Sequence, residues 1–426
     1  MYHVLAVSVL LRLFLLSQEA SGWLSDRIEL STPLNSWTRL KEGVALKEAG
    51  LSSYQSDLFH ETPLVLFLFQ YLLPLGDIIN GLFFIVADIL IAYCLAQLTR
   101  LHHQNELKNQ EQRTKSGGIG KGVEPILITR NESLPSIVAS VYLINPFSIL
   151  SCSAHSTVCF NNLSIVFGLW TSLKGNWFLC GMGMSLAVQF SLYPVMLLLP
   201  LSLTAYYSGR TSGVLKFLLY TVLWMIGILC VSLLITGGSW DFINGVYGVI
   251  LLVPDFTPNV GLFWYFFMEM FDHFQVFFLC VFQINAFIHA IPLTIRFNQD
   301  PMFLVYTLLS LISLFKSYPT VADFIIPVSL LPLWTHVFRY MRFTPVTIGC
   351  VLVSSIAGPI TWYLWIHTGS ANANFFFALT LTYCISQIFL LLDVCHSYLT
   401  HQYDMTNGLP RTSNKLGTGH VLLKLQ

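Results

Sequence analysis

The chain has 426 residues, of which 55% are hydrophobic and only 10% are charged, and its formal net charge is zero. Because an ordinary soluble domain carries about 25% charged residues, this composition excludes a typical soluble protein and indicates a polytopic integral membrane protein. A zero net charge provides no overall electrostatic field that favours nucleic acid, so we exclude nucleic-acid binding.

Apolar runs recur along the chain, and we expect residues 1–426 to form a single all-α integral membrane domain. A membrane helix needs about 20 apolar residues. The candidate runs are residues 4–16, 64–75, 78–98, 137–150, 158–173, 177–193, 195–207, 215–235, 274–295, 303–315, 324–338, 346–365 and 375–395. They predict about ten to twelve transmembrane helices. Several runs are short and contain proline or glycine, which favours broken or partial helices that border protein or a wet cavity.

The first apolar run allows two interpretations. Ala20, Ser21 and Gly22 resemble the cleavage site of a signal peptide. However, Arg12 interrupts the apolar stretch, and no Lys or Arg precedes it as at the start of a usual signal peptide. We therefore favour a retained first helix, while cleavage stays open as the alternative.

Two hydrophilic segments predict the orientation of the chain. Residues 18–61 carry seven acidic residues and four Lys or Arg, whereas residues 99–133 carry six Lys or Arg and four acidic residues. By the positive-inside rule, residues 99–133 are a cytoplasmic loop and residues 18–61 a lumenal loop. Four glycines between residues 117 and 122 favour flexibility in the cytoplasmic loop. Residues 400–426 are predicted to be a C-terminal tail.

The lumenal loop contains a helical pattern. Trp37, Leu40 and Val44 recur at helical spacing after a possible cap at residues 35–36, and Gly50 is placed to end the helix. An amphipathic helix lying in the plane of the lipid headgroups fits this pattern. The alternative is that its apolar face packs against the protein's own membrane helices.

The stretch between Lys216 and Arg339 is almost entirely apolar but keeps several charges. A charge near the middle of a bilayer costs roughly 3 kcal/mol or more, so these residues should lie at membrane edges or line a shared polar cavity. The eight charged residues are Asp241, Asp255, Glu269, Asp272, Arg296, Asp300, Lys316 and Asp323.

All nine cysteines lie in apolar runs, and no pair has the spacing of a zinc site or a redox motif. We therefore predict buried core cysteines, no metal and no cofactor. Cys152 and His155 are the nearest pair for nucleophilic catalysis. Their spacing supplies neither an oxyanion hole nor a third orienting group, so packing is the favoured interpretation.

Several motifs in the first half of the chain resemble membrane glycosyltransferases that use dolichol-phosphate mannose, particularly the first mannosyltransferase of glycosylphosphatidylinositol (GPI) synthesis. The motifs are SY at 53–54, HETPL at 60–64, LINPF at 143–147 and AVQFSLYP at 187–194. This resemblance implies a bundle of the glycosyltransferase-C type. It also implies an acidic base in the first lumenal loop, which needs reach to an acceptor hydroxyl.

A closer resemblance spans essentially the whole chain. The motifs are SWDF at 239–242, VPDFTPNVGLFWYFF at 253–267, FKSYPTV at 315–321 and GSANANFF at 369–376. They are similar to the phosphatidylinositol-glycan class U family, the multispanning subunits of GPI transamidase. The resemblance implies an endoplasmic reticulum membrane protein that works with other transamidase subunits, including a caspase-like subunit that supplies the nucleophile.

The acidic residues of the first lumenal loop help to choose between a mannosyltransferase and a transamidase subunit. The first lumenal loop has no Asp-x-Asp motif; Asp26 with Glu29, and Asp57 with Glu61 beside His60, are explained as solvated loop charges. We therefore predict a non-catalytic transamidase subunit that recognises the GPI lipid or presents it with the attachment signal of the precursor. A dolichol-phosphate-mannose-dependent mannosyltransferase is the alternative. A solute transporter is disfavoured because we find no internal repeat.

A GPI site needs an apolar wall for acyl chains and a polar mouth for phosphate and sugar. Each candidate also has a structural alternative: turn formation for Asp255 and Asn259, an aromatic interfacial belt for Trp264, and an internal salt bridge for Lys316. For the asparagines after Gly369, helix capping competes with hydrogen bonding to a glycan. The predicted ligand-binding residues are Asp255, Asn259, Trp264, His273, Lys316, Asn372 and Asn374.

Overall fold

The computed structural model describes residues 2–18, 20–118, 120 and 122–409. The described residues form helices and no strand, which confirms the predicted all-α class. Within the described residues, six helical segments are long and apolar enough to cross a membrane, or seven if a bent pair counts as one span. Further apolar helices have 10–17 residues, so the predicted short and broken helices are present among the expected spans.

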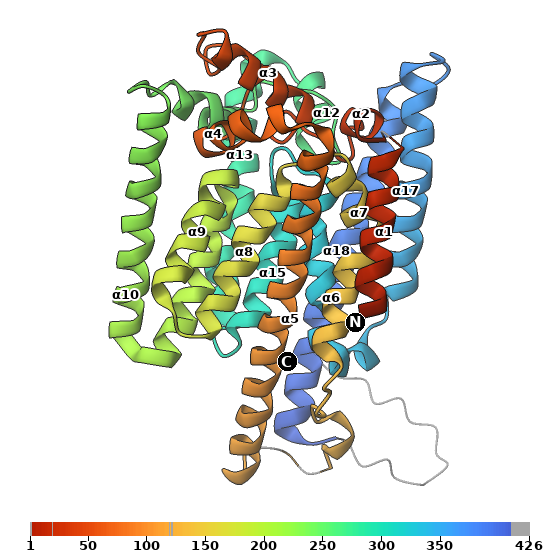
Figure 1. The fold of residues 1–426 in the computed structure, drawn as a ribbon. Coiled ribbons are helices and arrows are strands. Elements are labelled where there is room, and N and C mark those ends of the chain that lie inside the picture. Colours follow the sequence, from red (N-terminus) through yellow and green to blue (C-terminus); the bar gives the residue numbers. More distant parts are fainter. Residues whose placement is uncertain (1, 19, 119, 121, 410–426) are drawn as a thin grey trace.

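Five long helices run along the molecule (Figure 1): α5 (Asp77–Lys115), α10 (Leu198–Ile235), α13 (Asp272–Ile288), α17 (Thr344–Ile366) and α18 (Ala373–Asn407). Shorter helices pack with them: α1 (Tyr2–Ser17), α6 (Leu134–Ile144), α7 (Pro146–Ser153), α8 (Val158–Leu173), α9 (Trp177–Ser191), α14 (Ala290–Arg296), α15 (Pro301–Phe315) and α16 (Ile325–Leu330).

One end of the bundle, which we call the loop end, is covered by short helices: α2 (Ala20–Ser25), α3 (Trp37–Glu48), α4 (Pro63–Leu72), η1 (Leu73–Leu75), η4 (Ile243–Gly248), α11 (Val249–Leu252) and α12 (Phe263–Glu269). At the opposite end, which we call the stem end, α5 and α18 protrude beyond the other helices (Figure 1). The remaining short turns are η2 (Glu124–Ile126), η3 (Tyr193–Leu197), η5 (Val321–Phe324) and η6 (Leu331–Tyr340).

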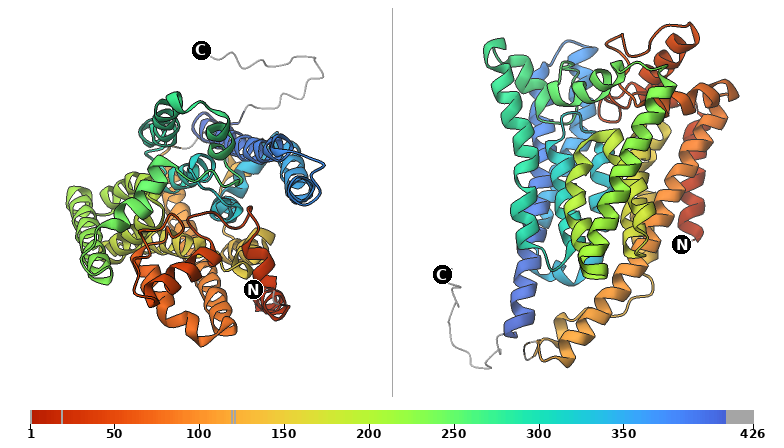
Figure 2. Two further views of the ribbon diagram at one scale, coloured as in Figure 1. Left: turned by 90° about the horizontal axis from the view of Figure 1, so that it is seen from above. Right: turned by 90° about the vertical axis from the view of Figure 1, so that its left-hand side faces the viewer.

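The helices pack around α5, which contacts α6, α7 and α8. α9 lies between α8 and α10, while α17 packs along α18 on the opposite side of the molecule (Figure 2). Two glycines of α9 allow the close approach of its neighbours. A Cβ atom at Gly183 would lie 2.9 Å from the carbonyl oxygen of Ser164, and one at Gly181 would lie 2.9 Å from the amide nitrogen of Thr221. Small residues at such crossings are typical of membrane helix packing.

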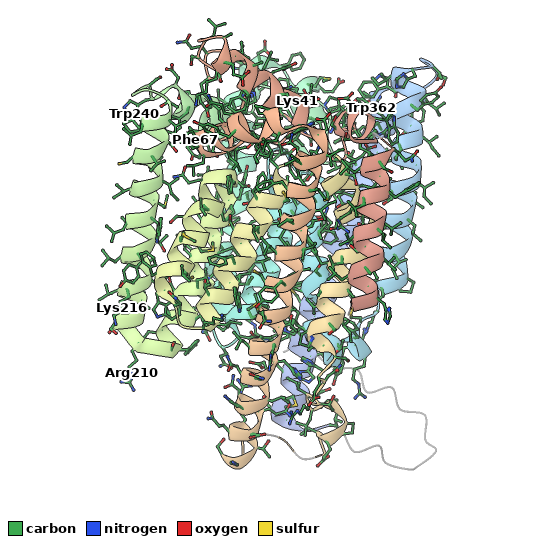
Figure 3. The ribbon with its side chains drawn as sticks, in the orientation of Figure 1. Lys41, Phe67, Arg210, Lys216, Trp240 and Trp362 are labelled. Atoms are coloured by element: carbon green, nitrogen blue, oxygen red, sulfur yellow. The ribbon has the colours of Figure 1, made fainter. Side chains whose placement is uncertain are left out.

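One break divides a predicted run into two helices, and one kink joins two predicted runs into a single helix. α6 and α7 meet at an angle of 52°, because Pro146 lacks the amide hydrogen that a continuous helix requires. Asn145 caps α7 by accepting a hydrogen bond from the amide of Phe147 at 2.9 Å. In α10 the backbone of Arg210 has φ 51° and ψ −145°, which joins the runs 195–207 and 215–235 through a kink. Figure 3 places Arg210 and Lys216 near the stem end, and Trp240 at the loop end.

The prediction of a flexible loop over residues 99–133 is wrong for its first half, because α5 continues to Lys115. Its Lys, Glu, Gln and Arg residues have high helix propensity, and the glycines all follow Lys115. In the remaining segment, the amide of Gly120 donates to the carbonyl of Met405 on α18 at 2.9 Å. The predicted C-terminal tail is helical up to Asn407, and its residues 410–426 lie outside the described part of the chain.

The predicted lumenal helix is present as α3, and its cap is Ser36, whose hydroxyl accepts from the amide of Arg39. Trp37, Leu40 and Val44 are buried in the main core. The ring of Trp37 packs edge-on against Phe69, with centroids 5.4 Å apart. The apolar face of this helix therefore packs against the protein itself rather than projecting towards lipid.

Helix α1 is joined to the bundle by a buried ion pair. A guanidinium nitrogen of Arg12 lies 2.8 Å from a carboxylate oxygen of Asp88 on α5, and both side chains are almost fully buried. Arg12 also donates to the hydroxyl of Ser148 at 2.7 Å, and Tyr142 donates to Asp88 at 2.8 Å. This network makes α1 an integral part of the structure.

Candidate functional site

An apolar pocket with a volume of about 200 Å³ lies at the loop end between α2, α7, α17 and α18. Its walls are built mainly from Leu24, Leu30, Phe147, Leu150, Val260, Val321, Pro359, Phe376, Leu379, Thr380 and Tyr383. The hydroxyl of Tyr383 is buried without a hydrogen-bond partner among the described residues. The pocket thus offers an apolar wall with one unused polar group.

Charged residues also line this pocket. Arg27 and Glu29 form an ion pair at 2.9 Å, with side chains that are 14% and 16% exposed. The guanidinium of Arg27 lies 5.5 Å from the centroid of the Trp23 ring. Both charges therefore remain accessible to a polar group beside an apolar interior.

An apolar groove of about 830 Å³ continues from the pocket between α6 and α17. The pocket and the groove share Phe147 and Ser355. Ile137 and Leu352 line the groove and are 41% and 54% exposed, so the groove is open at the side of the bundle. Together the two hollows form a path from the loop end along the apolar flank of the protein.

The start of α18 places two predicted residues close to the pocket. Asn372 caps this helix, because its side-chain oxygen accepts from the amide of Asn374 at 3.1 Å. The side-chain oxygen of Asn374 accepts from the hydroxyl of Tyr265. Both asparagines are exposed, and Phe376, two residues further on, is a wall of the pocket. The capping interpretation is confirmed for Asn372, and its exposed amide leaves room for a ligand.

Trp264 lies behind this wall rather than at the membrane surface. It is 1% exposed, and its ring packs against Phe376 and Trp365 at centroid distances of 6.1 and 6.3 Å. The interpretation of Trp264 as an interfacial anchor is therefore wrong, because the ring is covered by α17 and α18. Trp264 therefore packs behind Phe376, on the side of the pocket wall that faces away from the cavity.

Asp255 and Asn259 shape the turn that precedes Val260 of the pocket. The carboxylate of Asp255 pairs with Arg39 at 2.8 Å and accepts from the amide of Thr257 at 2.8 Å. Burial alone would raise the pKa of Asp255, but the hydrogen bonds from Thr257 and Arg39 outweigh it and the pKa lies below its ordinary value. Asn259 is fully buried and accepts from the amide of Gly261 at 2.8 Å. The structure thus supports turn formation for both residues.

Lys316 forms the internal salt bridge that was its alternative interpretation. Its ammonium lies 2.8 Å from a carboxylate oxygen of Asp323, and both side chains are buried. Asp323 also completes a capping box with Thr320 at the start of η5. The salt bridge and the capping box hold the backbone next to Val321, which lines the pocket. Lys316 therefore supports the pocket wall indirectly and is not a direct ligand.

The structure does not bring His273 to the pocket. It is exposed in the first turn of α13, and its ring lies against Phe274 at a centroid distance of 5.1 Å. Spacing along the sequence suggested a site continuous with Asp255, but α12 ends at Glu269 and the chain turns away.

Sequence reasoning missed the two charges nearest the pocket. No periodicity or motif surrounds Arg27 and Glu29, so the sequence predicts ordinary solvated loop charges at both positions. A long-range contact positions them: the amide of Val321 donates to the carbonyl of Glu29 at 3.1 Å. No local signal in the sequence could have indicated this pairing.

The acidic residues of the first loop do not form an open catalytic pair. Asp26 accepts a long hydrogen bond of 3.4 Å from Thr38, and Asp57 is exposed. Glu61 is buried and accepts from the hydroxyl of Thr157. Burial raises the pKa of Glu61 to about 8, opposed by the Thr157 hydrogen bond and the charge of Lys316. Glu61 therefore fastens the loop to α8.

The pair Cys152 and His155 is also buried. Both residues are at most 3% exposed. The ring of His155 is stacked on Phe84 with centroids 5.0 Å apart. A nucleophile in this position has no access to a substrate, which supports the packing interpretation.

The fold and these sites define a polytopic helical membrane protein with an apolar pocket opening beside charged residues. The sequence matches the family described as GPI transamidase subunit PIG-U over residues 6–383, and the chain belongs to this family. It is 38% identical to the GPI-anchor transamidase component PIGU of Homo sapiens, over 99% of this chain and 98% of that protein. It is 31% identical to the GPI transamidase component GAB1 of Saccharomyces cerevisiae, over 92% of each chain.

Proposed function

We propose that this chain is the GPI-recognising, non-catalytic subunit of GPI transamidase in the endoplasmic reticulum membrane. Its relatives are named as components of that enzyme. The GPI lipid is its ligand, and a separate caspase-like subunit supplies the nucleophile. The mannosyltransferase alternative is not favoured, because the first loop presents no open acidic pair.

The observation that carries the proposal is the apolar pocket that continues into a lateral groove. Acyl chains already reside in an apolar solvent in the membrane, so hydrophobic burial contributes little to selecting a lipid there. Shape and polar contacts must provide the selectivity instead. The hydroxyl of Tyr383 is placed to donate to an ester or phosphate oxygen, and Arg27 to attract the phosphate.

The predicted polar residues contribute at the outer end of this site. Asn372 and Asn374 lie four and two residues before Phe376 and present amides that both donate and accept hydrogen bonds. They are proposed to contact the glycan or the phosphate. Asp255, Asn259, Trp264 and Lys316 hold the surrounding walls, and His273 is proposed as a contact outside the pocket.

Two glycines of α17 provide a matched test of the pocket. Gly358 lines the pocket, and a Cβ atom built on it would meet nothing within 4 Å. Gly349 lies on the same helix, is exposed, also leaves open space for a Cβ atom, and does not line the pocket or the groove. Gly358→Leu therefore adds an apolar side chain at the pocket without a clash at its Cβ atom, and Gly349→Leu controls for the helical effect of the substitution.

The measurement is attachment of GPI to a reporter protein in cells that carry only the variant subunit, with affinity recovery of its partner subunits. Overfilling a site costs about 1–3 kcal/mol, or about 5- to 150-fold in affinity. Gly358→Leu should lower attachment within that range while the partners are recovered normally. Normal attachment by Gly358→Leu, or an equal loss with Gly349→Leu, would discard the pocket as the ligand site.

The GPI species that accumulates in cells lacking this chain distinguishes a transamidase subunit from a mannosyltransferase. Loss of the whole chain should leave complete GPI together with uncleaved precursor proteins. Accumulation of a GPI with a truncated glycan would instead indicate the mannosyltransferase. Complexes purified from cells that carry Gly358→Leu test the alternative that the pocket holds the attachment signal of the precursor, because their retention of GPI would then be unaffected.

A further inference from the structure

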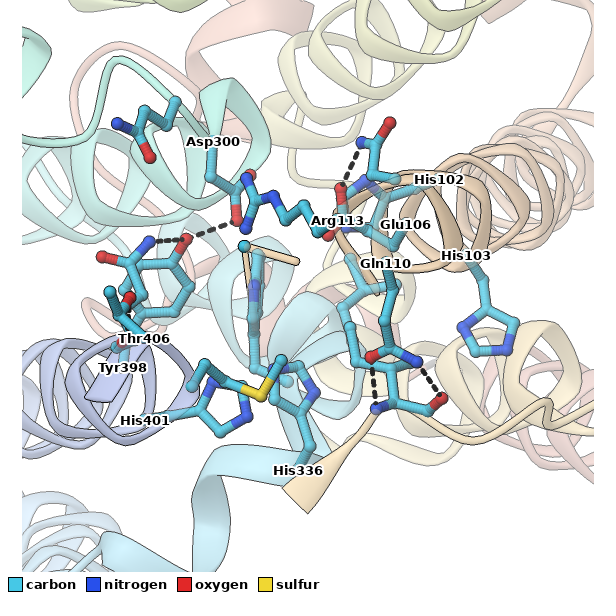
Figure 4. Close-up of a pocket in the computed structure, with 18 residues that line it drawn as sticks. His102, His103, Glu106, Gln110, Arg113, Asp300, His336, Tyr398, His401 and Thr406 are labelled. Atoms are coloured by element: carbon cyan, nitrogen blue, oxygen red, sulfur yellow. Dashed lines mark hydrogen bonds between the residues drawn. The ribbon is translucent and has the colours of Figure 1, made fainter. Parts of the chain in front are cut away.

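A second, polar cavity of about 160 Å³ lies at the stem end, far from the loop-end pocket along the bundle (Figures 1 and 4). It is enclosed by the protruding part of α5, by η6 and by the end of α18. A larger depression of about 740 Å³ adjoins it and shares Glu106, Arg113 and Asp300 with it. We refer to the two together as the stem-end hollow.

The walls of the hollow are held in place by hydrogen bonds. One carboxylate oxygen of Asp300 caps α15 by accepting from the amide of Phe303 at 3.0 Å, and the other accepts from the hydroxyl of Tyr398 at 2.9 Å. On the opposite wall, Gln110 of α5 donates to and accepts from the backbone of Ile128, at 3.1 and 2.8 Å. The hollow is therefore framed by several separate parts of the chain, including α5, the segment at Ile128, the start of α15 and α18.

The hollow combines both signs of charge with several amides. Lys108 and Arg113 line it from α5, and Glu106 lies on the same helix. None of these three forms a salt bridge within the part of the chain that the structure describes. Figure 4 shows Arg113 directed into the space between Glu106 and Asp300. Amides from Asn105, Asn109 and Gln112 complete this wall.

This composition narrows the class of ligand. Carboxylates beside the cations disfavour a bare phosphate, and the cations disfavour an uncharged sugar, whereas amides and carboxylates both suit hydroxyl groups. Among the described residues no cluster of His, Cys, Asp and Glu could hold a metal ion, so the histidines of the hollow do not form a metal site. Its floor is apolar, since Leu169, Leu201 and Val305 lie along it. A polar wall above an apolar floor matches an amphiphile.

We propose that the stem-end hollow binds a phosphorylated polyol. Lys108 and Arg113 contact the phosphate, Glu106 and the neighbouring amides accept from the hydroxyls, and the apolar floor lies beneath the glycerol end of a lipid. Two sources present this chemistry: the headgroup of an inositol phospholipid in the adjoining leaflet, or a free inositol phosphate. The site is separate from the loop-end pocket and does not depend on the function proposed for it.

The test uses the full-length protein within its purified complex, reconstituted in nanodiscs of phosphatidylcholine. Labelled phosphatidylinositol, phosphatidic acid and inositol 1-phosphate are the probes, and retention of each is measured. Arg113→Gln removes the phosphate contact and Glu106→Ala removes the hydroxyl acceptor. Lys115→Gln is the matched control, because Lys115 lies two residues after Arg113 on α5 and does not line the hollow.

Arg113→Gln should lower retention of phosphatidylinositol about 10-fold or more, as expected for loss of a charge-assisted hydrogen bond. Glu106→Ala should lower retention of phosphatidylinositol but not of phosphatidic acid, while Lys115→Gln changes neither. Binding of inositol 1-phosphate alone identifies the free metabolite as sufficient, and binding of the lipid alone identifies the leaflet as the source. Equal retention by the original protein and Arg113→Gln, or no preference for phosphatidylinositol over phosphatidylcholine, would overturn the proposal.

Discussion

The buried pair of Arg12 and Asp88 offers the sharpest prediction about stability. It joins α1 to α5, and its side chains are 1% and 4% exposed. Asp88→Leu removes the carboxylate and leaves the guanidinium of Arg12 buried without a counter-charge. Arg12→Met removes the guanidinium with little change in volume, and the double variant removes both charges.

The three variants should differ in a defined order. Breaking a buried ion pair by removing one partner costs about 3–5 kcal/mol, and Asp88→Leu should lie in that range. Arg12→Met should cost less, because Asp88 keeps the hydrogen bond from Tyr142. The double variant should be more stable than Asp88→Leu, since no buried charge remains unpaired.

Thermal unfolding of the detergent-solubilised protein measures this order, and a double-mutant cycle gives the coupling between the two residues. The coupling should exceed 1 kcal/mol, which is about the upper limit for an exposed pair. Additive effects of the single variants would refute the reasoning. Unchanged stability of Arg12→Met and Asp88→Leu would also show that α1 is absent from the mature protein, as cleavage of a signal peptide requires.

Three further predictions concern the loop end and the orientation. Asn372→Ser should keep the cap of α18, while Asn372→Ala should lose about 1 kcal/mol; impaired reporter attachment by Asn372→Ser would therefore indicate a ligand contact beyond the cap. Glu61 has a pKa raised from 4.5 to about 8 on folding, so the folded state holds the proton more tightly and loses stability as the pH rises from about 5 to 8. Glu61→Gln should flatten this dependence in thermal unfolding and keep GPI attachment; a several-hundredfold loss of attachment would instead indicate a general base. A glycosylation site engineered at Ser52 should be modified and Asn131 should not, and the reverse pattern in a gel-shift assay would invert the predicted orientation.

The sequence determined the class of the protein and the position of most helices. Long apolar runs have few alternatives to helices in a membrane, because every backbone polar group must be satisfied internally. Pro146 and the capping pattern before Trp37 are local signals for helix ends. The structure has a helix break at Pro146 and a helix that begins at Trp37. The motifs around residues 253–267 and 315–321 also sufficed to indicate the family, which the comparison confirmed.

Local patterns were less informative about the length of α5. The positive charges of residues 99–133 predict a cytoplasmic loop. In the structure, residues of high helix propensity extend α5 into this segment as far as Lys115. Where a helix extends out of the membrane, its sequence is no longer a continuous apolar run, although its residues still have high helix propensity. Just beyond this helix, the amide of Gly120 donates to the carbonyl of Met405 near the end of α18.

The site itself was decided by tertiary structure. Sequence placed the polar residues Asp255, Lys316 and Asn372 among the ligand candidates, but only the fold showed that the first two are neutralised by Arg39 and Asp323. It also brought Arg27 to the pocket through contacts between distant segments. The physical reason is that helix formation depends on residues a few positions apart, whereas a pocket and its free charges depend on which distant side chains meet. Composition determined that this chain folds as a membrane bundle, and packing alone decided where that bundle leaves room for a ligand.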